Sequence, residues 1–245
     1  AKYCKNLPLD MLGMTGKFHT TWGEFGGYKH PNALIYECAA MIAYGAKCSI
    51  GDQLHPMGDM SISTYELIGA AYRHIEMCEP FCQDTANIAE IAVFSSQSQS
   101  DTADNPDIGA ARILLEGHFL FDVIDSEMAL DKYKLIILPD VIRINADLQS
   151  KLNRYLAAGG KLLLTGHSGL DSQTGSAIFD IGADYHGLSP YCPDYALPTE
   201  SVRPDFTKDP MVMYLRSHRI KAVKGRSLGK IYDPYFNREY NHFCN

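Results

Sequence analysis

The sequence has no excess of positive charge and no long apolar run. Its 22 lysines and arginines stand against 29 aspartates and glutamates, a net charge of −7 that argues against nucleic acid or an anionic membrane as partner. No apolar run approaches the about 20 residues of a membrane-spanning helix. No basic segment followed by an apolar one marks a signal peptide. We therefore expect a protein that binds neither nucleic acid nor membrane.

Paired cysteines are also lacking, because the seven cysteines are an odd number without a disulfide-type spacing. Cys78 and Cys82 are close, but no second ligand pair of the zinc type accompanies them. Cys38 and Cys48 fall at apolar positions, where a thiol acts as a small hydrophobic side chain. The pattern favours reduced thiols and a cytoplasmic location.

A glycine-rich phosphate loop is absent as well, since no G-x-G-x-x-G follows a predicted strand. We therefore expect no nucleotide and no other cofactor. Residues 165–169 (Thr-Gly-His-Ser-Gly) follow a strand as a nucleophile elbow does, but they read G-x-S-G and lack a convincing downstream His–acid pair. We favour a glycine-rich turn in which Ser168 caps the next segment, and a hydrolase built on Ser168 stays open as a further hypothesis.

The 245 residues, 46% hydrophobic and 21% charged, suffice for one or two domains with a sizeable core. Strand patterns at 14–21 and 46–50 alternate with a helix pattern at 32–44 and with a helix that a capping box at 63–66 would open. This second helix is expected to bury Leu67, Ile68, Ala71, Tyr72 and Ile75. Residues 1–82 therefore predict the last two β/α units of a (β/α) barrel. Two units cannot close a barrel, so we expect a C-terminal fragment whose other barrel strands are missing.

Residues 83–190 predict a complete α/β domain with a flavodoxin-like, doubly wound parallel sheet. Its strands are expected at 88–94, 121–124, 135–138 and 161–165. One helix would follow an Asn105-Pro106 cap and bury Ile108, Ala111, Leu115 and Phe119, and another would span 147–158. Residues 191–245, rich in proline and tyrosine, predict a β-rich extension with a strand at 212–215.

Two polar clusters follow the predicted strands of residues 1–82. Glu24 and Asp52 are the carboxylates at these strand ends, and glycoside hydrolysis needs two carboxyl groups across the scissile bond. We interpret them as catalytic candidates. The side chains around them would bind the substrate, the indole by stacking on a sugar and the others by hydrogen bonds: His19, Trp22, Gln53 and His55.

Each of these residues also has a structural interpretation. Glu24 can cap a loop, Asp52 can hold a turn, and His55 before Pro56 can fix a bend. A metal site of His19, Glu24, Asp52 and His55 is conceivable on ligand type, but the spacing matches no zinc motif, so no metal is predicted.

The two clusters carry a family resemblance. Residues 19–24 (His-Thr-Thr-Trp-Gly-Glu) and 51–56 (Gly-Asp-Gln-Leu-His-Pro) resemble a group of glycosyl hydrolases with barrel domains, similar to the alpha-L-fucosidases of glycoside hydrolase family 151. Residues 83–190, with 138–140 and 158–162, resemble the middle, trimerisation domain of family 42 beta-galactosidases, which has a class I glutamine amidotransferase-like fold. The closing segments 234–238 and 242–244 also resemble this hydrolase group.

The resemblance implies a carbohydrate-active enzyme that acts on O-glycosidic bonds of a fucoside or galactoside, and a homo-oligomer such as a trimer. An amidotransferase would carry a cysteine nucleophile where Ser168 stands. Family 42 enzymes have a catalytic glutamate at the end of the seventh strand. In this sequence we expect Thr20 or Thr21 at that position, so the resemblance does not identify a catalytic nucleophile in this chain. The alternative is a non-catalytic assembly or carbohydrate-binding module with a degenerate amidotransferase fold.

Overall fold

The structure, a computed structural model, describes residues 1–99 and 106–236. The expected cap at Asn105 and the resembling residues 237–238 and 242–244 lie outside this part. The chain divides into two compact units, the first comprising Ala1–Val93 with Ile113–Lys134, and the second Phe94–Arg112 with Leu135–Asn245. The boundaries expected at 82/83 and 190/191 remain predictions.

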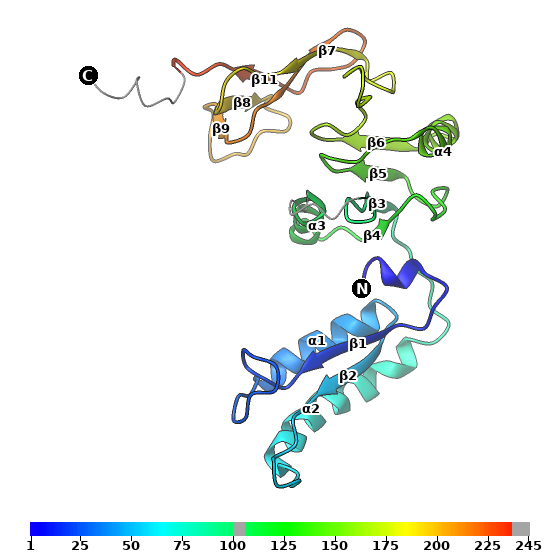
Figure 1. The fold of residues 1–245 in the computed structure, drawn as a ribbon, viewed down its shortest axis with the longest axis vertical. Helices are drawn as coiled ribbons and strands as arrows, with labels where there is room; N and C mark the ends of the chain where they lie inside the picture. The colour runs from blue at the N-terminus through cyan, green and yellow to red at the C-terminus, as the bar shows by residue number, and fades with distance from the viewer. Residues whose placement is uncertain (100–105, 237–245) are drawn as a thin grey trace, which may run out of the picture. The chain divides into compact units, whose positions relative to one another are not determined.

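The first unit begins with two strand–helix pairs (Figure 1). A short 3₁₀ helix, η1 (Cys4–Asn6), precedes them, and another, η2 (Glu79–Phe81), follows them. The pairs are β1 (Leu12–Gly16) with α1 (Pro31–Ala43) and β2 (Lys47–Gly51) with α2 (Ile62–Cys78). The strands are parallel, in a register that sets Leu12 against Lys47 and Gly16 against Gly51. The alternation of strands and helices is thus as predicted.

The two helices begin differently from one another. The His30 ring accepts a hydrogen bond from the Asn32 amide at 3.1 Å and so caps α1, whose first residue is a proline. Helix α2 begins at Ile62, and its N-cap, Ser61, makes no capping bond through its side chain. The expected capping box at 63–66 is therefore wrong, because its residues lie inside the first turns of the helix.

A small apolar core joins the two helices to β2. It consists of Leu34, Cys38, Ile68, Ala71 and Ile75, with Cys48 and Ile50 packed against it. Burial raises the pKa of the Cys38 thiol to about 11, which fits a hydrophobic rather than a reactive role. The expected burial of Tyr72 is wrong, since the ring remains 41% exposed.

The other face of β1 is open. Leu12 and Met14 are 61% and 60% exposed, while Gly13 lies against the Met41 side chain of α1. The sheet of β1 and β2 is therefore covered by helices on one face only. The strand also stops at Gly16 rather than at residue 21, and Lys17 and Phe18 after it are buried.

A second sheet has the strand order β4-β3-β5-β6. Its strands are β3 (Ile91–Phe94), β4 (Phe121–Ile124), β5 (Leu135–Leu138) and β6 (Lys161–Leu164). β5 and β6 are parallel, and the first strand in sequence lies inside the sheet, as in flavodoxin-like folds. This arrangement agrees with an amidotransferase-like α/β region.

The helices of this region are α3 (Pro106–Glu116) and α4 (Ala146–Ala157). Helix α4 is capped by Asn145, which accepts from the Leu148 amide at 2.9 Å, and it is followed by Gly159 at a φ of +95°. The face expected for α3 is wrong: Ile108 is 63% exposed and Leu115 52%, while Leu114 is buried. Apolar residues occur all round this helix, so their spacing does not select a face.

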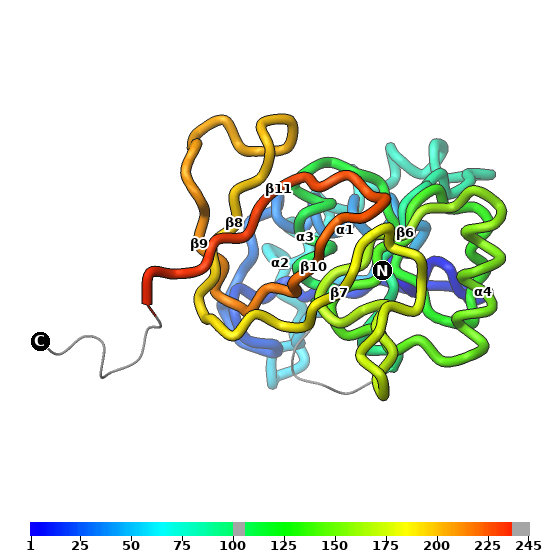
Figure 2. The backbone as a smooth tube through the Cα atoms, turned by 90° about the horizontal axis from the view of Figure 1, so that it is seen from above, coloured from blue at the N-terminus to red at the C-terminus, as the bar shows by residue number. Residues whose placement is uncertain are grey.

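The remaining strands form two antiparallel sheets. One sheet pairs β7 (Ala183–Leu188) with β10 (His218–Ala222), and the other has the order β11-β8-β9. The strands of the latter are β8 (Asp194–Pro198), β9 (Met211–Met213) and β11 (Gly229–Tyr232). Figure 2 shows the segment from β7 to β11 from above. Within residues 1–99 and 106–236, no helix has the length and apolar character needed to cross a membrane.

Asp122 of β4 holds together several segments of the first unit. Its carboxylate is fully buried and receives Lys5 Nζ at 2.6 Å, Lys132 Nζ at 3.0 Å, Tyr133 Oη at 2.8 Å and Asn87 Nδ2 at 2.7 Å. Burial alone would raise the pKa of Asp122, but these hydrogen bonds outweigh it and keep the pKa below its usual value.

Replacing Asp122 by asparagine should lower the free energy of unfolding by about 1.5–3 kcal/mol, because the largely buried Lys5 loses its counter-charge and the hydrogen bonds from Asn87 and Tyr133 lose a charged acceptor. Denaturant unfolding of this chain measures the change. Glu90→Gln is the matched control: its pair with Lys134 is exposed, and such pairs contribute about 0–1 kcal/mol. Equal losses in the two variants would show that the network does not stabilise the fold.

The pH dependence of stability in the wild type and in Asp122→Asn tests the lowered pKa of Asp122. Because the folded-state pKa of Asp122 is lowered, its contribution is complete above the unfolded aspartate pKa of about 3.9 and is lost as pH falls through the folded value. The stability difference between wild type and Asp122→Asn should therefore be constant at about pH 5–7 and shrink below about pH 4. A difference that grows on acidification would contradict the lowered pKa.

Candidate functional site

The two predicted polar clusters lie at one edge of the β1–β2 sheet. The strands are parallel and Gly16 pairs with Gly51, so their carboxyl ends meet. Lys17 follows the first strand directly and Asp52 follows the second. The Lys17 amide also donates to the Gly51 carbonyl at 3.0 Å, which extends the pairing by one step.

The indole of Trp22 lies across the paired glycines. A Cβ atom added to Gly51 would lie 2.2 Å from Cη2 of the indole, and one added to Gly16 would lie 3.1 Å from Cζ3. The Phe18 ring packs edge-on against the indole, with centroids 5.2 Å apart. Trp22 is nevertheless 63% exposed, so the ring has support below and a free surface.

Glu24 is held within its own loop. Its Oε1 atom accepts from the Thr20 amide at 2.6 Å, and this bond is the main cause that lowers the pKa of Glu24. A Cβ atom on Gly27 would lie 2.3 Å from the same oxygen, so the loop closes tightly over the carboxylate. Glu24 is therefore ionised at neutral pH, and it makes the loop contact that the structural interpretation predicts.

Asp52 and His55 also make local contacts. Asp52 Oδ1 accepts from the Gln53 amide at 2.8 Å, and His55 Nδ1 accepts from the Met57 amide at 3.2 Å. Such bonds hold the turn and the bend after β2. The His55 side chain remains exposed, whereas that of Asp52 is only 12% exposed.

Contacts between the loops show which candidates come together. The Gln53 amide oxygen lies 3.9 Å from the Cβ position of Gly23, and the rings of Phe25 and His55 are 6.2 Å apart. With Trp22 over Gly51, these contacts set residues 22–25 beside residues 51–55. His19 and Glu24 line an open hollow of about 500 Å³ together with Phe25, Gly26, Gly27 and Tyr28. Among the described residues, no hydrogen bond or ion pair joins Glu24 to Asp52, and these residues contain no group of three or more metal-type ligands.

Sequence reasoning missed Lys17. We expected Thr20 or Thr21 at the end of the strand, but β1 ends at Gly16, so Lys17 holds that place and the expectation is wrong. Its Nζ atom lies 3.8 Å from Asp52 Oδ1, and the residue is only 3% exposed. The one available signal was a lysine directly after an apolar strand.

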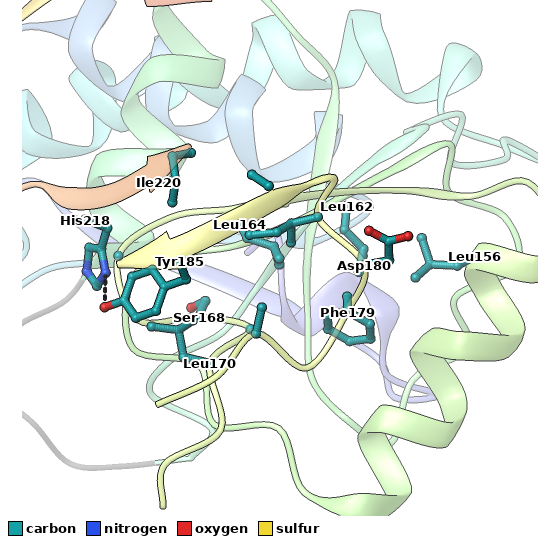
Figure 3. A pocket seen from close by; sticks show the side chains of 15 residues that line it. Leu156, Leu162, Leu164, Ser168, Leu170, Phe179, Asp180, Tyr185, His218 and Ile220 are labelled. Carbon is teal, nitrogen blue, oxygen red and sulfur yellow. Dashed lines mark hydrogen bonds between the residues drawn. The ribbon is translucent and has the colours of Figure 1, made fainter. Parts of the chain in front are cut away.

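The second unit contains a separate pocket of about 500 Å³ (Figure 3). Mostly apolar side chains line it, with Ser168, Asp180, Tyr185 and His218 among them. Tyr185 Oη lies 3.1 Å from His218 Nδ1, and burial, assisted by the charge of His167, lowers the pKa of His218.

Ser168 is not placed as an exposed nucleophile. It is buried, and its Oγ atom accepts from the Ile142 amide at 3.0 Å. Among the described residues no histidine is hydrogen-bonded to it. The geometry matches a residue that fixes the turn after β6.

Comparisons with known proteins point to glycoside hydrolases. Residues 112–182 match the family model of the beta-galactosidase trimerisation domain. The chain is 44% identical to alpha-L-fucosidase isoenzyme 2 from Paenibacillus thiaminolyticus, covering 99% of this chain and 38% of that one with a TM-score of 0.93. No protein with a curated description matches significantly.

More distant structures share the fold. The beta-galactosidase from Bacillus circulans sp. alkalophilus is 16% identical over 93% of this chain and 39% of its own, with a TM-score of 0.66. The beta-galactosidase from Rahnella sp. R3 is 15% identical over the same shares, with a TM-score of 0.65. The chain thus spans less than half the length of each of these relatives. The resemblance inferred from the sequence is confirmed: nearly the whole chain is similar to part of an alpha-L-fucosidase, and residues 112–182 match the model of the beta-galactosidase trimerisation domain.

Proposed function

We propose that this chain is part of a longer glycoside hydrolase of the alpha-L-fucosidase or beta-galactosidase type, in which the loops after β1 and β2 contact the sugar. The observation that carries the proposal is that residues 22–25 and 51–55 lie side by side at the carboxyl ends of two parallel strands. Active sites of (β/α) barrels are built at this edge. The 44% identity to a fucosidase supports a fucoside as the substrate class.

The open face of β1 supports a barrel origin for residues 1–82. In a closed barrel, side chains such as Leu12 and Met14 would fill the interior, while α1 and α2 would form part of the outer ring. We infer that the remaining strands come from a longer chain. Residues 83–190 would then serve assembly, and 191–245 would form an extension.

The charge of Glu24 limits its role. A lowered pKa suits a base, a nucleophile or a stabiliser of positive charge, whereas a general acid needs a raised pKa. We therefore assign the ionised role to Glu24, keep Asp52 as the second catalytic carboxyl group, and place the proton donor in the rest of the barrel. Trp22 would stack on the sugar, and hydroxyl groups would bind His19, Gln53 and His55.

In the full-length enzyme, Glu24→Gln and Asp52→Asn should each lower kcat for an aryl fucoside or galactoside by about 100-fold or more, because each removes a negative charge at the reacting centre. Steady-state kinetics measures the effect. Asp10→Asn is the matched control, because Asp10 is almost fully exposed and pairs with Lys47 at the opposite end of the strands. Unchanged turnover in both site variants would remove these carboxylates from the mechanism.

The stacking role has its own optical test, because Trp22 is the only tryptophan of the chain. Binding of the sugar should change its fluorescence, and Gly51→Ala should weaken binding about tenfold by pushing the indole off its support. Gly109→Ala adds the same methyl group in α3, where no atom lies within 4 Å, and should bind normally. Equal affinity in the two variants would argue against stacking on Trp22.

A second candidate function is assembly without catalysis, favoured by the trimerisation-domain match at residues 112–182. Sedimentation of this chain at micromolar concentration should then show a homo-oligomer, and we expect a trimer. Monomers across the whole concentration range would exclude the assembly function. An oligomer from a full-length protein that hydrolyses no glycoside would favour assembly over catalysis.

A further inference from the structure

Lys17 is a buried cation at the candidate site that no proposed step yet uses. Its side chain is 4% exposed, and its Nζ atom lies between the rings of Tyr28 and Phe18, at 4.5 and 5.0 Å from their centroids. Burying an ammonium group is costly unless it has a counter-charge. A lysine kept in this place therefore requires a partner.

That partner is Asp52. Within the described ranges the ion pair of Lys17 is with this carboxylate, at 3.8 Å. The neighbouring lysine, Lys29, is committed elsewhere, donating to Thr15 Oγ1 at 2.8 Å and to Glu37 at 2.9 Å. The two lysines thus pair with different carboxylates. Of these, only Asp52, the partner of Lys17, belongs to the candidate site.

The pair joins the ends of the two strands. Lys17 follows β1, Asp52 follows β2, and the backbone bond from Lys17 to Gly51 fixes their spacing. The Gln53 amide binds Oδ1, the oxygen that is 3.8 Å from Lys17. Among the residues that the structure describes, Oδ2 accepts no hydrogen bond, and the Asp52 side chain as a whole is only 12% exposed.

We propose that Lys17 is a positioning residue that holds the Asp52 carboxylate in its working orientation. The inference rests on the proposed function, since it assigns a use to Asp52 in the hydrolytic site. The two aromatic rings keep water from the ammonium, which strengthens its attraction to the carboxylate. Lys17 itself touches no substrate.

The test compares variants of the full-length enzyme. Lys17→Met keeps the length and apolar packing of the side chain but removes its charge, and should lower kcat about 10- to 100-fold with KM within about twofold, since a misplaced group loses rate rather than binding. Lys29→Met, which removes the charge of a half-buried lysine bound to Glu37, is the matched control and should keep the wild-type kcat.

A double-mutant cycle separates positioning from simple stability. In the Asp52→Asn background, Lys17→Met should change kcat less than twofold, because there is no carboxylate left to orient. If Lys17→Met fails to fold, Lys17→Gln replaces it in the same cycle. Additive losses of kcat, or a wild-type kcat in the folded variant, would overturn the inference.

The outcomes also distinguish this inference from the proposed function. A wild-type protein that hydrolyses neither fucoside nor galactoside refutes the proposed function and the inference with it. An active wild type whose Lys17 and Asp52 variants lose activity independently refutes the inference alone.

Discussion

The close approach of two strand ends is the constraint on which the candidate site depends. Gly16 and Gly51 pair at the ends of β1 and β2, and the missing side chains leave room for the Trp22 indole to lie across both. A larger residue at either position would push the ring away and separate the loops. The backbone at this edge therefore decides whether the polar residues that follow can act on one ligand.

The two units of the chain carry different features. In the first, polar residues gather at the open end of a half-covered sheet, as expected for one arc of a barrel. The trimerisation-domain match at 112–182 runs across parts of both units, and Ser168, which the resemblance would place where an amidotransferase has its nucleophile, is buried and bonded to the backbone.

The sequence predicted the bounds of helices and strands well where turn or capping residues mark both ends of the element. The strands β4 and β5 have the predicted bounds because short apolar runs end at polar turns, and α4 is bracketed by Asn145 and Gly159. The end of β1 was missed because its β-like pattern continues through Phe18 and Thr20, while the chain turns where Lys29 bonds to Lys17. The buried face of α3 was missed because its apolar residues surround the helix.

The candidate site could be predicted only in part for a similar reason. Glu24, Asp52 and Trp22 could be predicted as site residues from their side-chain chemistry. Lys17 could not, because a lysine is usually exposed to solvent and its sequence position does not show its partner. The contact between Lys17 and Asp52 depends on the parallel register of β1 and β2, in which Gly16 pairs with Gly51. These two glycines are 35 residues apart in the sequence, so no local sequence pattern encodes their pairing. Likewise, the loop bond that lowers the pKa of Glu24 spans a turn that includes Gly23, whose φ is +82°.

Whether the two loops share one sugar is tested most directly by amide NMR shifts of this chain during titration with L-fucose. Shifts that gather at residues 19–24 and 52–55, with none in the second unit, are expected if the loops form one binding site. An absence of shifts, or shifts confined to the pocket around Tyr185 and His218, would contradict a saccharide site at the ends of β1 and β2.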